Sequence, residues 1–75
     1  MNKARRVRIG KVREGLEALR QEVEMLAEEE QEAAANLADI GQEDRATEME
    51  EAAGKLEDAS GQIAEVAELL EEAAE

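Results

Sequence analysis

Hydrophobic residues recur at alternating steps of three and four along the first half of the chain. The members of this first seam are Ile9, Val12, Leu16, Leu19, Val23, Leu26, Ala33 and Leu37, with Glu30 as the one polar member. This spacing places side chains along one face of an α-helix, where a second helix can cover them. The sequence therefore predicts a long helix over residues 3–37.

A cluster of turn-forming residues interrupts the pattern. The segment from Asn36 to Asp44 reads NLADIGQED, which combines Asn, Asp and Gly, the residues that stop helices and form turns. We place the turn at residues 38–43. Asp44 or Thr47 is expected to cap the following helix, and Thr47 with Glu50 forms the T-x-x-E pattern of a capping box.

The second half of the chain repeats the seam, which predicts a second helix over residues 44–74. Its members are Met49, Ala52, Leu56, Ala59, Ile63, Val66, Leu70 and Ala73. A chain that folds back at Gly41 pairs the two seams along their whole length, for example Leu19 with Ile63 and Leu26 with Leu56. The sequence thus predicts a single all-α domain over residues 1–75, an antiparallel two-helix, coiled-coil-like hairpin.

Small residues form a further row beside the second seam. They recur every seven residues, at Ala46, Ala53, Ser60, Ala67 and Ala74. A face this wide favours a second helix contact, so we interpret the row as a self-association surface through which hairpins form a helical bundle, a dimer in the first instance. Two alternatives remain: the row is a solvated helix side, or residues 36–44 straighten in a domain-swapped dimer.

Composition excludes most kinds of chemistry. The chain has no His, Cys, Pro or aromatic residue. Disulfides, the common zinc and haem sites and aromatic stacking platforms are therefore absent, and we expect no cofactor and no metal. Ser60 and Thr47 are the only hydroxyl residues and have no histidine to activate them. We expect no catalytic residue and no enzymatic activity.

Charge is divided sharply along the chain, whose net charge is −12. Residues 1–20 hold seven basic and two acidic side chains, whereas residues 21–75 hold two basic and nineteen acidic ones. One interpretation is that the basic start of the first helix neutralises the acidic end of the second. The other is an anion-binding edge formed by Arg6, Arg13 and Arg20, which recur every seven residues.

Acidic side chains gather around the turn without compensating bases. The candidates for binding a basic partner are Glu28, Glu29, Glu32, Asp39, Glu43 and Asp44. Such a run is usually a solvated face, but dense carboxylates on a rigid rod also match a basic groove on another protein. No apolar run approaches the length of a membrane span, so we expect no membrane partner and a cytoplasmic location.

The chain resembles short acidic helical proteins carried by phages and integrated mobile elements, mainly of Gram-positive bacteria. The similarity involves the opening KARRVRIGKV, the central EEEQEA with Asn36 and Leu37, and the closing EMEEAAGKLEDASGQIAEVAELLEEA. Those proteins carry an aromatic residue where this chain has Ala34 and Pro where it has Ala38. The resemblance implies a phage or mobile-element origin, a bacterial host cell and no particular activity.

The sequence supports three hypotheses about function. The first is a non-enzymatic interaction protein, an oligomeric acidic hairpin that acts by binding and, if phage-encoded, inhibits a host (defence) protein. The second is sequestration of a nucleotide or nucleic acid by Arg6, Arg13 and Arg20, which predicts strongly salt-dependent binding. The third is a purely architectural assembly module.

Overall fold

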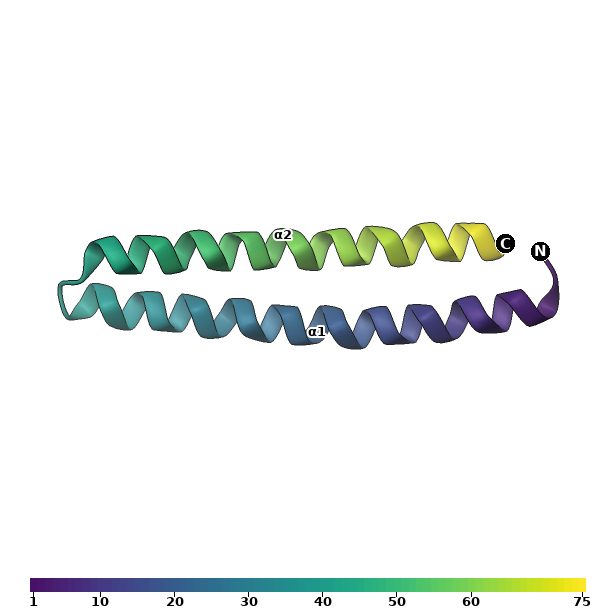
Figure 1. Ribbon diagram of the computed structural model, residues 1–75, viewed down its shortest axis with the longest axis horizontal. Helices are drawn as coiled ribbons and strands as arrows, with labels where there is room; N and C mark the ends of the chain where they lie inside the picture. Colours follow the sequence, from purple (N-terminus) through teal and green to yellow (C-terminus); the bar gives the residue numbers. More distant parts are fainter.

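Two long helices make up almost the whole chain in the computed structural model, which describes residues 1–75 (Figure 1). Helix α1 spans Lys3–Asp39 and helix α2 spans Glu43–Ala74. The helices lie side by side and antiparallel, so both termini lie at the end opposite the turn. The prediction of an all-α antiparallel hairpin is confirmed.

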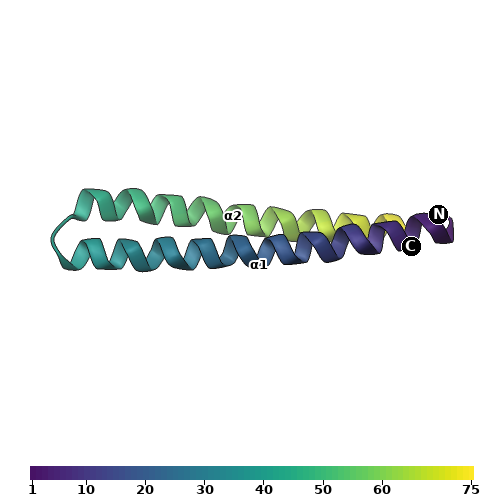
Figure 2. The same ribbon diagram turned by 60° about the horizontal axis from the view of Figure 1, so that its bottom comes forward.

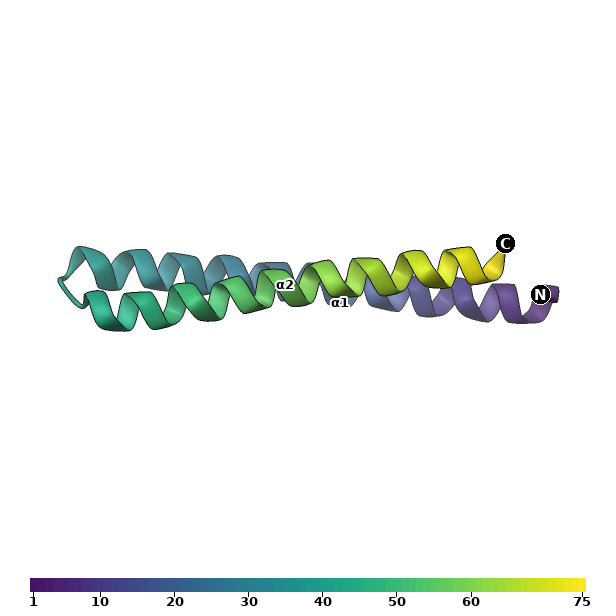
Figure 3. The same ribbon diagram turned by 90° about the horizontal axis from the view of Figure 1, so that it is seen from above.

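The molecule is a thin rod. Its Cα atoms span 58 × 14 × 10 Å and have a radius of gyration of 17.1 Å, whereas a compact chain of this length has a radius of about 11 Å. The helices cross gradually along the rod, as Figures 2 and 3 show. Each helix therefore covers only one side of its neighbour, and most side chains remain accessible to solvent.

A glycine in the left-handed region closes the turn. Gly41 has φ of 83°, a conformation that other residues adopt at a cost. The amide of Gly41 donates to the carbonyl of Ala38 at 3.1 Å, and that of Gln42 donates to Leu37 at 2.8 Å. These two bonds form a Schellman motif, which satisfies the last carbonyls of α1. Because of this motif, α1 continues to Asp39 and the connection is shorter than the predicted 38–43.

The two helix starts are capped differently. The side chain of Asn2 accepts a hydrogen bond from the amide of Arg5 at 2.9 Å, so α1 has a side-chain N-cap. Helix α2 begins after Gln42, which makes no side-chain cap bond. The predicted capping role of Asp44 or Thr47 is wrong, because both lie inside α2 after its first residue, and the hydroxyl of Thr47 donates to the carbonyl of Glu43 at 3.0 Å.

Small residues fill the centre of the helix interface. The five buried residues are Ala27, Ala34, Ala46, Ala53 and Ser60. They recur every seven residues on each helix, as residues that face a partner helix do. The predicted self-association row is therefore wrong in its placement: Ala46, Ala53 and Ser60 are buried against α1, and Ala67 and Ala74 are half-buried in the same row.

The predicted seam of α1 combines two rows of residues spaced seven apart, and only one of these rows lies in the helix interface. Leu16, Val23, Leu37 and their seven-residue neighbours are half-buried, as expected. In contrast, Leu19 is 54% exposed and Leu26 is 50% exposed. The central row of α1 instead contains Arg13, Arg20, Ala27 and Ala34, so the predicted pairs of Leu19 with Ile63 and Leu26 with Leu56 do not form the centre of the interface. Small side chains at the centre allow the helix backbones to approach closely.

Candidate interaction surfaces

Arginines of the first helix bind carboxylates of the same chain. Arg13 forms an ion pair with Glu71 of α2, with 3.1 Å between Nη2 and Oε2. Arg20 pairs with Glu17 and Glu24, which lie one turn before and one turn after it on α1. Arg6 is exposed and forms no ion pair. Two of the three predicted anion-binding guanidiniums are therefore already engaged, and the structure does not assemble the three into one free site.

A network around Arg20 connects the helices. Glu24, which binds Arg20, also accepts a hydrogen bond from the hydroxyl of Ser60 at 3.2 Å. The hydrogen bond from Arg20 lowers the pKa of Glu17, and the same bond raises the pKa of Arg20. Arg20 therefore binds acids of its own helix, and the contact that matches neutralisation of the acidic end of α2 by the basic start of α1 is the ion pair of Arg13 with Glu71.

Polar contacts between the helices all lie along one edge of the rod, which we call the polar edge. They are the ion pair of Arg13 with Glu71, the bond of Ser60 with Glu24, and a hydrogen bond from Gln31 to Glu57. The acceptors Glu57 and Glu71 are two heptads apart, so they occupy the same side of α2. The polar edge is thus one of the two long sides of the helix interface.

Apolar side chains line the opposite long side, which we call the apolar edge. It consists of Val12, Leu19, Leu26, Ala33 and Ile40 from α1 and its C-cap, and Ala52, Ala59, Val66 and Ala73 from α2. The seven-residue spacing places each set on one side of its helix. Ile40 is 68% exposed and is the most exposed large hydrophobic residue in the chain. The sequence alone misassigned this edge to the core, although the seven-residue Ala and Ser row was a signal that a different face is central.

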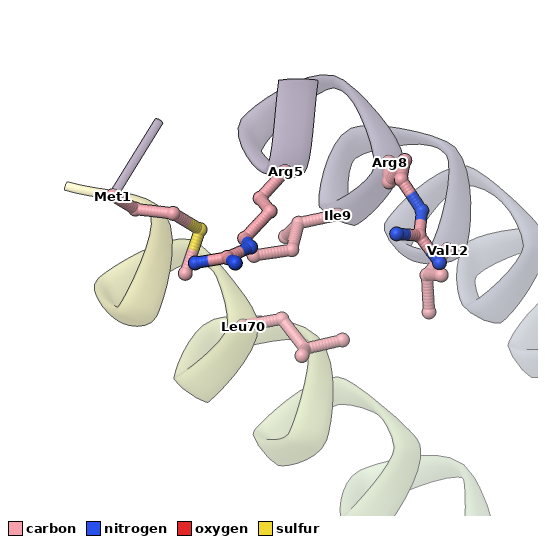
Figure 4. A pocket seen from close by; sticks show the side chains of 6 residues that line it. All are labelled: Met1, Arg5, Arg8, Ile9, Val12 and Leu70. Atoms are coloured by element: carbon pink, nitrogen blue, oxygen red, sulfur yellow. The ribbon is translucent and has the colours of Figure 1, made fainter. Parts of the chain in front are cut away.

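An open pocket lies at the terminal end of the apolar edge. It measures about 270 Å³ and is lined by Met1, Arg5, Arg8, Ile9, Val12 and Leu70. Figure 4 shows Leu70 projecting from α2 toward the start of α1, which supplies the other helical side chains. We call it the end pocket. Its apolar floor and two guanidiniums fit an apolar group with negative charge close by.

The turn half of the rod carries the entire net charge. Residues 21–59 hold fourteen acidic and two basic side chains, and the remaining residues hold seven of each. We call residues 21–59 the acidic half. The six candidate partner-binding acids, Glu28, Glu29, Glu32, Asp39, Glu43 and Asp44, are exposed and form no ion pair. Arg45 bonds Gln42 and not a carboxylate.

The structure contains no grouping of acidic side chains that is suited to hold a metal ion. Neither helix combines the length and the hydropathy required to cross a membrane. No protein-family model, curated protein or solved structure matches the chain. The phage-like origin therefore remains a prediction.

Proposed function

We propose that the protein is a non-enzymatic interaction protein, an acidic helical hairpin that acts by binding through its outer surfaces. The observation that carries this proposal is that no large apolar side chain is fully buried. The hairpin fills its centre with alanine and leaves Leu19, Leu26 and Ile40 on the apolar edge. Exposed apolar side chains aligned on one face are typical of surfaces that bind other proteins.

The acidic half defines the chemistry of a foreign partner. Its carboxylates lie on two rigid helices and, apart from Glu24, which pairs with Arg20, form no ion pair. Such a surface attracts a basic protein surface at long range and repels nucleic acid and anionic lipid. A basic groove on another protein is therefore the target class that we propose. In a phage setting, such a target would be a host protein that the hairpin inhibits in the bacterial cytoplasm.

Capture of proteins from a bacterial lysate, at low and moderate salt, tests this proposal. One variant replaces Glu28, Glu29, Glu32 and Asp39 with their amides. A matched control replaces Glu65, Glu68, Glu72 and Glu75 with Gln, which removes the same charge at the other end. We expect basic proteins to bind the wild type and the control, to be lost with the acidic-half variant, and to elute with salt.

Two outcomes would contradict the proposal. One is capture of the same proteins by both variants with no dependence on salt. The other is binding by the wild type of neutral or acidic proteins only, since electrostatic complementarity predicts basic partners.

The ion pairs of Arg13 and Arg20 count against the nucleotide or nucleic-acid alternative. Phosphates would have to displace Glu71 from Arg13 and both Glu17 and Glu24 from Arg20. We expect no measurable binding of a fluorescent oligonucleotide even at low salt, where phosphate contacts are strongest. Salt-sensitive binding that is lost when Arg6, Arg13 and Arg20 are replaced by Gln would reverse this conclusion.

A further inference from the structure

We propose that a second copy of the chain covers the apolar edge. The two hairpins pack edge to edge with their turns at opposite ends, and Ile40 of each copy occupies the end pocket of the other. This inference deepens the proposed function, because it names the partner of the apolar edge. The resulting dimer is a four-helix bundle whose interface differs from the Ala46 to Ala74 row.

The surface area of one chain supports a second copy. A compact protein of 8.2 kDa exposes about 4,500 Å², whereas this chain exposes 5660 Å². The difference, about 1,100 Å², is larger than the roughly 800 Å² that each partner buries in a standard interface. Contact along the apolar edge would therefore bring the chain close to the exposure of an ordinary folded protein.

The spacing of the apolar edge is self-complementary under a two-fold rotation. When two copies of α1 run antiparallel about an axis between Leu19 and Leu26, these two residues meet each other across the interface. The same operation brings Val12 against the small Ala33 of the second copy. It also brings Ile40 of the second copy to Arg5, at the end pocket. A two-fold interface requires this reciprocal matching.

Electrostatic repulsion favours the orientation in which the turns of the two copies lie at opposite ends of the dimer. The entire net charge of −12 lies in the acidic half, so a dimer with both turns at one end would bring two such halves together. In the opposite orientation they lie at the two ends of the bundle. Arg5 and Arg8 of the end pocket then lie near the acidic turn of the second copy, which contains Glu43 and Asp44. Attraction replaces repulsion at both ends.

Light scattering on purified protein at micromolar concentration tests the dimer. We expect the wild type to have twice the chain mass and the double variant Leu19→Gln, Leu26→Gln to have the chain mass. Both residues are at least half exposed in a single hairpin, so the variant should retain its helix content. Met25→Gln is the matched control, because Met25 is 59% exposed on a side of α1 away from the apolar edge and should leave the dimer intact.

The end pocket is tested separately with Ile40→Gln. We expect this variant to weaken dimerisation at least tenfold, because the pocket loses its apolar occupant. An unchanged dimer would overturn the assignment of Ile40 to the pocket.

Cross-linking tests the orientation. The chain has no cysteine, so an introduced residue is its only thiol. Glu22→Cys lies next to the two-fold axis and should give covalent dimers with a short bifunctional thiol reagent. Glu29→Cys, one heptad along the same side of α1, should not, because antiparallel copies hold its two thiols about 20 Å apart along the rod. No cross-linking at Glu22→Cys, or equal yields from the two variants, would overturn the antiparallel arrangement.

The outcomes separate this inference from the proposed function. A wild-type monomer, or a dimer that survives both edge substitutions, would overturn the self-association but leave binding of basic proteins by the acidic half standing. A dimer that captures no basic protein would support the inference and contradict the proposed target class.

Discussion

At the residue scale, small side chains determine how closely the two helices approach. Ala34 and Ala53 are each 1% exposed and lie in the central rows of α1 and α2. A methyl group at these positions allows the larger side chains beside it to pack over the interface. Arg13 and Arg20 share the row of Ala34, where their long aliphatic stems can cover apolar surface while their charged ends reach the polar edge.

Enlarging a central alanine should therefore destabilise the hairpin. We expect Ala34→Leu to lower the free energy of unfolding by about 1–3 kcal/mol, because the added volume forces the helices apart. Ala35→Leu is the control at the next position, which is exposed, and should change stability by less than about 0.5 kcal/mol. Urea denaturation followed by circular dichroism compares the two, and equal effects would contradict the close packing.

Two glycine-to-alanine substitutions should have opposite effects on the stability of the hairpin. A Cβ added to Gly61 meets nothing within 4 Å, so Gly61→Ala should stabilise α2 by about 0.5–1 kcal/mol. Gly41→Ala should destabilise the protein by about 1–2 kcal/mol, since φ at Gly41 is 83°. The same denaturation measurement would contradict the Schellman turn if alanine were tolerated equally at both positions.

At the element scale, the sequence predicted the helices and the turn but only half of the interface. Each helix has three rows of residues that could face the other helix. The row of Leu16 lies in the interface in both the predicted and the observed arrangement. The second row is decided by whether the helices bury bulky side chains or approach closely over small ones. Arg13 and Arg20 made their row look polar, and hydropathy therefore favoured Val12, Leu19 and Leu26. The pairing of Arg13 with Glu71 depends on the register between the folded helices, which composition does not reveal, whereas the pairs of Arg20 with Glu17 and Glu24 lie within one helix at spacings of three and four.

The Arg20 network predicts a pH dependence. Because Arg20 lowers the pKa of Glu17 below its ordinary value of 4.5, the stabilisation is complete above that value and is lost as the pH falls through the lowered pKa. We expect Glu17→Gln to lower the melting temperature at neutral pH and to have progressively less effect in acid. Glu14→Gln, which removes an unpaired carboxylate, corrects for the general relief of acidic repulsion. A Glu17→Gln effect that does not depend on pH would contradict this role.

At the scale of the whole molecule, one side of the rod is polar and bonded within the chain, and the other is apolar and open. The turn half carries the net charge, and the open half is neutral. These two asymmetries support two kinds of contact, a second copy on the apolar edge and a basic protein on the acidic half. The sequence predicted an acidic, self-associating hairpin, but it placed self-association on residues that the structure buries.

Small-angle X-ray scattering of the wild type, with mass and maximum dimension taken from one sample, is the most direct test of the edge-to-edge dimer of hairpins. We predict a dimer whose length stays near the 58 Å of one hairpin, because the two copies lie side by side. A domain-swapped dimer would extend to about 110 Å, the length of one continuous helix of this chain. That length would contradict the hairpin dimer, and so would a particle with the mass of a single chain.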